Sequence, residues 1–187
     1  MQIDSQIFLR LAEKAGRLVF VDIEASGLRG DYNSILCVSL KPYGEKPTTY
    51  CVIQPGNDKR VVREVKEALE DYDCWCGYYS KGFDLPMINT RLLKWGLEPV
   101  EKRHHIDLYY TLKANLLTAR RSQAHLLEWL ETPETKMTVS ADVWNRVADE
   151  ETRHAALATL RRRCESDVAG LEALYRKTCH IITEIKK

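Results

Sequence analysis

The sequence lacks the features that mark exported, membrane-spanning and disulfide-stapled proteins. Nowhere do about 18 apolar residues run together, and no basic stretch at the start leads into an apolar segment with a small-residue cleavage site. The six cysteines lie in apolar or strand-like contexts without the spacing of a disulfide framework. We therefore expect a cytoplasmic protein that is neither exported nor bound in a membrane.

The chain also lacks an excess of charge of either sign. It has 28 Lys and Arg residues against 27 Asp and Glu residues, a formal net charge of +1. No global field therefore attracts nucleic acid or a membrane, and any site for a polyanion must depend on local clusters of Arg and Lys.

Residues 17–28 combine an apolar run with two acidic residues. The apolar run 18–21 favours a central strand that is covered on both faces. Asp22 and Glu24 follow it, and residues two apart on a strand point to the same side. Such neighbouring carboxylates repel each other unless a cation lies between them. The alternative is that the strand ends at Asp22 and both acids lie in a solvated loop.

Hydrophobic periodicity predicts the other elements. Strands are predicted at 35–40, 48–53, 75–77 and 106–109, and helices within 1–16 and at 61–69, 84–95, 110–117, 123–130 and 155–179. This order predicts an α/β fold with a mixed five-stranded sheet, three antiparallel strands and then two parallel ones, with helices on both faces. We predict a single domain over 1–187, in which 1–16 is a lead-in helix and 17–187 the core.

Two later acids are placed to join the first pair. Asp84 begins a predicted helix, where capping that helix is an ordinary alternative role. Asp167 lies near the buried stripe that Cys164 and Leu171 mark on the last helix, where an unpaired carboxylate is costly. Four such carboxylates suit two Mg²⁺ or Mn²⁺ ions, which prefer oxygen ligands and, at about 4 Å separation, support phosphodiester hydrolysis.

Three segments, in this order, resemble the motifs of the DEDD 3′→5′ exonucleases of the DnaQ-like group, within the RNase H-like superfamily. Residues 22–28 are similar to the first motif, Asp-x-Glu-x-Thr-Gly-Leu, with Ala25 and Ser26 where Thr is common. Residues 78–84 and 164–168 are similar to the second and third motifs. His105-Ile-Asp-Leu resembles an added strand of a subgroup of predicted bacterial and phage exonucleases.

The resemblance implies an RNase H-like fold and a metal-dependent 3′→5′ exonuclease for 3′ ends of single-stranded DNA or RNA, with DNA favoured. It also implies that the metal ligands of a two-metal mechanism are Asp22, Glu24, Asp84 and Asp167. Backbone groups at 24–26, which include Ala25 and Ser26, would meet the terminal 3′-hydroxyl. Leu28 would be a wedge against the terminal base, or else a core residue.

Other candidate substrate contacts follow from the residues themselves. Tyr79 and Phe83 offer stacking surfaces for single-stranded bases, with Lys81 near a phosphate, although aromatic residues also flank ordinary sheet edges. Arg163 lies one helical turn before Asp167 and is the preferred phosphate contact. The sequence does not identify a protein partner.

One departure from the family pattern concerns the general base. The family has Tyr or His four or five residues before the last Asp, where this chain has Arg163 and Arg162. Because arginine stays protonated, it cannot serve as a base. The alternative function is therefore a catalytically weak or inactive module that binds nucleic-acid ends or a partner protein. His154 is the first other candidate for the base.

Two further sets of possible metal ligands are explained better by structural roles. Cys74-x-Cys76 with His104 and His105 suggests zinc, but the short gap and the missing second cysteine pair favour buried structural cysteines. Asp107 is either a fifth acid near the metals or, as we favour, the cap of the following helix.

Overall fold

The computed structural model describes residues 5–14, 16–183 and 185. Its five-stranded sheet has the order β3-β2-β1-β4-β5, with β1 in the middle. The strands are β1 (Leu18–Ala25), β2 (Ile35–Pro42), β3 (Thr48–Cys51), β4 (Cys74–Gly77) and β5 (His104–Asp107). β1, β2 and β3 pair antiparallel, whereas β4 and β5 extend the sheet in parallel. The predicted mixed sheet is confirmed.

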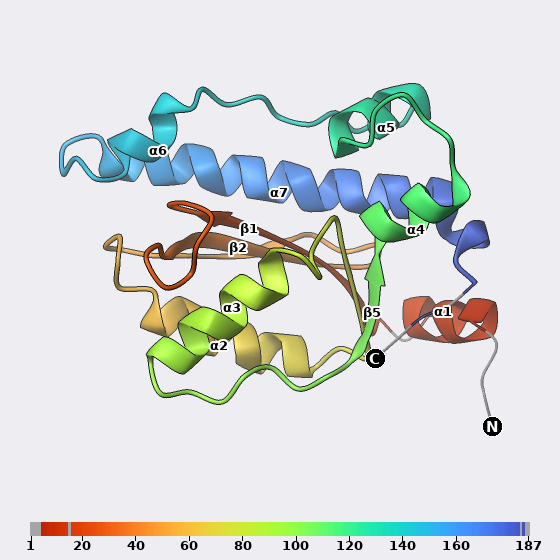
Figure 1. The fold of residues 1–187 in the computed structure, drawn as a ribbon, viewed down its shortest axis with the longest axis horizontal. Helices are drawn as coiled ribbons and strands as arrows, with labels where there is room; N and C mark the ends of the chain where they lie inside the picture. Colours follow the sequence, from red (N-terminus) through yellow and green to blue (C-terminus); the bar gives the residue numbers. More distant parts are fainter. Residues whose placement is uncertain (1–4, 15, 184, 186–187) are drawn as a thin grey trace.

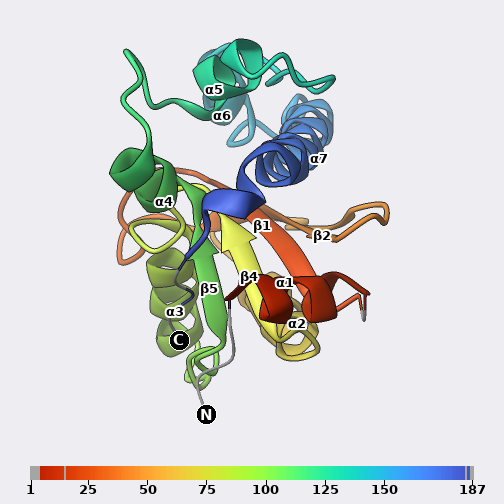
Figure 2. The ribbon, with the colours of Figure 1, turned by 90° about the vertical axis from the view of Figure 1, so that its right-hand side faces the viewer.

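Helices cover both faces of this sheet, as predicted (Figure 1). α7 crosses one face, and α2 and α3 lie on the other, whereas α1 packs close to β1 (Figure 2). The helices are α1 (Ser5–Lys14), α2 (Lys59–Glu70), α3 (Asp84–Lys94), α4 (Leu108–Asn115), α5 (Gln123–Trp129), α6 (Asp142–Arg146) and α7 (Arg153–Thr178), followed by the short 3-10 helix η1 (Cys179–Ile181). Residues 1–4 and 15 of the predicted lead-in helix lie outside the described residues.

Alternation along β1 determines which helices its side chains meet. Val19, Val21 and Ile23 share a buried cluster with side chains of α2 and α3. Phe20 faces the opposite way, and its ring centroid is 5.5 Å from that of Tyr175 in α7. Asp22 and Glu24 follow Phe20 at the same two-residue spacing, so they also face α7.

Several boundaries differ from the sequence prediction by a few residues, and one short helix was not predicted. β5 ends at Asp107 rather than at residue 109, because the Asp107 carboxylate caps α4 and accepts a hydrogen bond from the Tyr109 N–H at 3.1 Å. The favoured capping role of Asp107 is thus confirmed. α6 was not predicted, since in five residues it buries only Val143 and leaves no periodic pattern. In the described ranges, no helix is long and apolar enough to cross a membrane.

Candidate metal centre

Three acidic side chains converge where β1 passes beneath α7. Asp22, Glu24 and Asp167 each place a carboxylate oxygen within 4.8 Å of the others. Asp22 is partly buried, whereas Glu24 and Asp167 are only 6% and 2% exposed. Over the residues that the structure describes, this is the only group of three or more carboxylates, imidazoles or thiols close enough to hold a metal ion.

The surroundings of these acids favour their protonated forms. Burial, reinforced by the charges of Asp167, Asp84 and Glu24, raises the pKa of Asp22 well above its ordinary value. Burial raises the pKa of Glu24 to about 7 although Arg163 opposes the shift. Burial also raises the pKa of Asp167, although the nearby charge of Lys136 lowers it. The cluster therefore retains protons near neutral pH, and binding of a cation would displace them.

Two cationic side chains contact the same carboxylates. Lys136 Nζ lies 3.0 Å from Asp167 Oδ2, and Arg163 Nε lies 2.7 Å from Glu24 Oε1 and 3.7 Å from Asp167 Oδ2. The Arg163 guanidinium also lies over the ring of Trp144, 5.0 Å from its centroid. Asp167 Oδ1 is buried, yet it accepts no hydrogen bond from any described residue. This oxygen therefore remains available to a ligand.

Asp84 lies beside the cluster and not within it. It is the first residue of α3, and its carboxylate accepts hydrogen bonds from its own N–H and from that of Ile23. The N-cap position belongs to Phe83, so Asp84 does not cap the helix from there. Burial raises the pKa of Asp84 to about 7, and its charge in turn raises that of Asp22. The fourth acid is thus electrostatically coupled to the first.

An open pocket of about 380 Å³ exposes the three acids. Five of the predicted substrate contacts line it: Ala25, Ser26, Leu28, Phe83 and Arg163. Lys81 instead lines another pocket with His105 and Asp107. Tyr79 packs against the rings of Tyr109 and Tyr110. The structure therefore separates Tyr79 and Lys81 from the acidic pocket.

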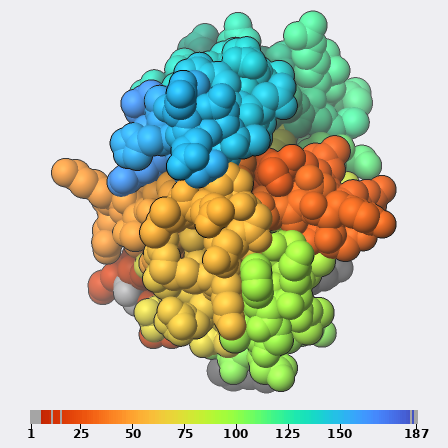
Figure 3. All heavy atoms as spheres, turned by 90° about the vertical axis from the view of Figure 1, so that its left-hand side faces the viewer, coloured from red at the N-terminus to blue at the C-terminus, as the bar shows by residue number. Residues whose placement is uncertain are grey.

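The loop 26–34 forms one wall of this pocket and projects from the surface as the lobe coloured orange-red in Figure 3. The Ser34 N–H donates to Ser26 Oγ at 3.0 Å and closes the base of the loop. A Cβ added at Gly27 would lie 2.4 Å from Asn33 Oδ1, so any larger residue there would have to displace the Asn33 side chain. Leu28 is 80% exposed, so its alternative role as a core residue is wrong.

The His105-Ile-Asp segment supports the loop that leads to Asp84. The Asp107 carboxylate accepts hydrogen bonds from the N–H groups of Tyr79 and Lys81, both at 2.9 Å. His105 Nε2 lies 2.8 Å from Ser80 Oγ, and burial lowers the pKa of His105 to about 3, so the imidazole is neutral. This segment positions the backbone and does not enter the acidic pocket.

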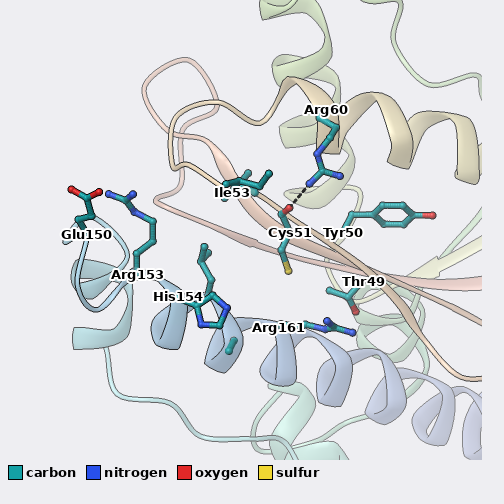
Figure 4. Close-up of a pocket in the computed structure, with 12 residues that line it drawn as sticks. Thr49, Tyr50, Cys51, Ile53, Arg60, Glu150, Arg153, His154 and Arg161 are labelled. Atoms are coloured by element: carbon teal, nitrogen blue, oxygen red, sulfur yellow. Dashed lines mark hydrogen bonds between the residues drawn. The ribbon is translucent and has the colours of Figure 1, made fainter.

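His154 lies away from the acids, in a separate pocket beside β3 (Figure 4). Among the described residues that line the acidic pocket, none is His or Tyr. Arg163 thus lines the pocket at the position where the DEDD exonucleases that this sequence resembles have Tyr or His. Lys136 and Trp144 take part in this pocket although the sequence did not indicate them, because both come from the aperiodic region between α5 and α7.

Comparisons with known proteins agree with the observed fold. The family model of the RNase H superfamily matches residues 19–179. No curated protein matches the chain. Among solved structures, the chain is similar to the family B DNA polymerase from the hyperthermophilic archaeon Pyrobaculum calidifontis, with a TM-score of 0.69 and 18% sequence identity. The similarity covers 87% of this chain but only 24% of the polymerase chain, and it concerns the fold.

Proposed function

Because this chain belongs to the RNase H superfamily, we propose that it is a metal-dependent nuclease that removes nucleotides from the 3′ ends of single-stranded nucleic acid. The observation that carries the proposal is that carboxylate oxygens of Asp22, Glu24 and Asp167 lie within 4.8 Å of one another. In addition, Asp167 Oδ1 is buried and accepts no hydrogen bond from any described residue. Such a costly arrangement is explained if a cation completes it.

The donor set fits two Mg²⁺ or Mn²⁺ ions, since every candidate ligand is a carboxylate oxygen. Asp22, Glu24 and Asp167 would hold them, with Asp84 contributing from the side of Asp22. When bound, such ions activate water and stabilise the leaving oxygen of a phosphodiester.

The pocket walls would position the substrate. Leu28 and Phe83 offer apolar surfaces for the terminal base, and the backbone at Ala25 and Ser26 lies beside the acids, where a 3′-hydroxyl would bind. Arg163 is the cation placed to contact a phosphate, and stacking over Trp144 orients its guanidinium.

One observation favours a second function, a module that binds nucleic-acid ends without cutting them. Arg163 stands at the expected base position and is paired with Glu24, and the described lining residues include neither His nor Tyr. A general base typically contributes about 10²–10⁴-fold, so its absence predicts slow or absent hydrolysis.

A cleavage assay separates the two functions. Single-stranded DNA and RNA labelled at the 5′ end would be incubated with Mg²⁺, Mn²⁺ or EDTA, with Asp167→Asn as the inactive control. We expect a metal-dependent ladder that shortens from the 3′ end, and no cleavage of circular single strands. Retention of the labelled strand without shortening in either metal would support the binding module and contradict the nuclease.

A further inference from the structure

A pair of thiols lies on the same side of the sheet as the acids. Cys37 in β2 is the register partner of both Glu24 in β1 and Cys51 in β3. Because neighbouring strands are about 4.8 Å apart, Cys51 lies roughly 10 Å from Glu24 across the sheet. The Sγ atoms of Cys37 and Cys51 are 2.8 Å apart, and both cysteines are free.

The strand pairing allows these two sulfurs to form a bond. The Val52 N–H donates to the Leu36 carbonyl at 2.9 Å, so the next pair, Cys37 and Cys51, is a non-hydrogen-bonded pair of the antiparallel ladder. In such pairs the Cα atoms are about 4.5 Å apart, within the range of about 4.4–6.8 Å seen in disulfides. An S–S bond is about 2.0 Å long, so the sulfurs need to approach by roughly 0.8 Å.

The two thiols differ in accessibility and surroundings. Cys37 is fully buried, whereas Cys51 is partly exposed and lines a pocket of about 680 Å³ with Arg60, His154 and Arg161. Figure 4 shows the Cys51 sulfur directed toward α7, on the side of His154 and Arg161. Its hydrogen bond with Cys37 lowers the pKa of Cys51, and the charges of Arg161 and Arg60 add to this lowering against the opposing effects of burial and Glu165. Partly exposed thiols in positive surroundings are the reactive ones.

We propose that Cys51 and Cys37 form a thiol pair that reacts with hydroperoxides, independently of the nuclease function. The Cys51 thiolate attacks the terminal oxygen of the hydroperoxide, the O–O bond breaks, and the other oxygen takes up a proton and leaves as an alcohol, or as water when the oxidant is hydrogen peroxide. Cys51 is then a sulfenic acid. The Cys37 sulfur displaces its hydroxyl group, which leaves as water with the Cys37 proton. Two thiols are oxidised to one disulfide, and the hydroperoxide is reduced.

Peptide mapping of the oxidised full-length protein tests this assignment. The reduced protein would be treated with hydrogen peroxide, and we expect a Cys37–Cys51 peptide pair to form while Cys179 stays reduced. Cys179 is the matched control, since it is also partly exposed but burial raises its pKa. Oxidation of Cys179 before Cys51, or disulfides between chains through Cys51, would overturn the proposal.

Two variants identify the attacking sulfur. Cys37→Ser should retain a sulfenic acid at Cys51 that dimedone traps, whereas Cys51→Ser should leave Cys37 reduced because Cys37 is buried. Absence of the dimedone adduct in a Cys37→Ser protein with wild-type circular dichroism would refute the mechanism. If this variant does not fold, the order of oxidation in the wild type decides the question.

Discussion

Buried carboxylates of this protein are compensated in two opposite ways, one in a complete cluster formed by Asp58, Arg91 and Trp95, the other in the acidic cluster of the candidate metal centre. Asp58 is fully buried and accepts hydrogen bonds from Arg91 Nε and Nη2, both at 2.8 Å, from Trp95 Nε1 at 2.7 Å and from the Ile35 N–H at 2.8 Å. By contrast, the three acids of the candidate metal centre share two cations, and Asp167 Oδ1 accepts no hydrogen bond from any described residue. A fully paired carboxylate supports the fold, whereas an under-compensated cluster indicates where a ligand is needed.

The complete cluster also supports a wall of the acidic pocket. Arg91 Nη1 donates to the Gly30 carbonyl at 3.0 Å, which ties the loop 26–34 to the pair formed by Asp58 and Arg91. Leu28 projects from this loop at the wall of the acidic pocket. The buried ion pair therefore holds a pocket wall to which it contributes no side chain.

The largest effect is expected from removing a charge in the under-compensated cluster. Asp22→Asn should abolish detectable cleavage and weaken Mn²⁺ binding in calorimetry, because a ligand is lost. It should also raise the free energy of unfolding of the metal-free protein at pH 8 by about 1 kcal/mol or more, since repulsion and desolvation are relieved. The exposed Asp31→Asn in the loop 26–34 is the matched control. Unchanged Mn²⁺ affinity in Asp22→Asn would refute the ligand assignment.

Removing a charge from the complete cluster should instead lower the free energy of unfolding. Arg91→Leu leaves Asp58 buried and without its partner, which typically costs about 3–5 kcal/mol. Arg103→Leu breaks an ion pair with the exposed Glu101 and should cost less than about 1 kcal/mol. Urea denaturation measures both values. Similar losses in the two variants would remove the distinction between the clusters.

The third prediction concerns the arginine that stands at the base position. Arg163→His should speed the chemical step by about 10-fold or more, because a group that accepts protons is restored. Arg163→Ala should weaken substrate binding and reduce its salt dependence by about one unit of slope. Single-turnover cleavage separates the two effects. A slower chemical step in Arg163→His would show that the arginine itself assists hydrolysis.

The metal-free protein should lose stability as pH rises from about 4.5 to 7. Glu24 and Asp84 have ordinary pKa values of 4.5 and 3.8, and burial raises both to about 7 in the folded protein. In this window the folded state binds more protons than the unfolded state, so the free energy of unfolding falls, by up to about 5 kcal/mol for the two groups together. Denaturation across this range in EDTA measures the fall. A rise would contradict the raised pKa values.

The smallest effect is expected at Lys136. Lys136→Gln removes a cation that competes for Asp167, so Mn²⁺ affinity should rise by about 2- to 5-fold, in line with the ~0.5–1 kcal/mol of a partly exposed ion pair. Lys46→Gln, at an exposed site, should leave the affinity unchanged. Weaker Mn²⁺ binding in Lys136→Gln would mean that the ammonium supports the metal centre instead of competing with it.

The sequence predicted those parts of the site that periodic elements carry. Alternation in β1 placed Asp22 and Glu24 on one side, and the buried stripe of α7 placed Asp167 toward them, as the structure confirms. Lys136 was not predictable, because it lies in a segment without periodicity. Asp58 stands at the N-cap of α2, but its side chain makes no cap hydrogen bond and pairs with a residue 33 positions away. Such long-range pairing leaves no local signal.

The geometry of α7 restricts how this protein can change during evolution. Cys164 Sγ lies 3.2 Å from the Asp22 carbonyl, and three residues later Asp167 reaches the same strand. Each residue of an α-helix advances the side-chain direction by about 100°, so one residue inserted between these two would turn Asp167 away from β1. Substitutions at the partly exposed residues 165 and 166 can accumulate during evolution, whereas insertions and deletions in this turn are expected to be eliminated by selection.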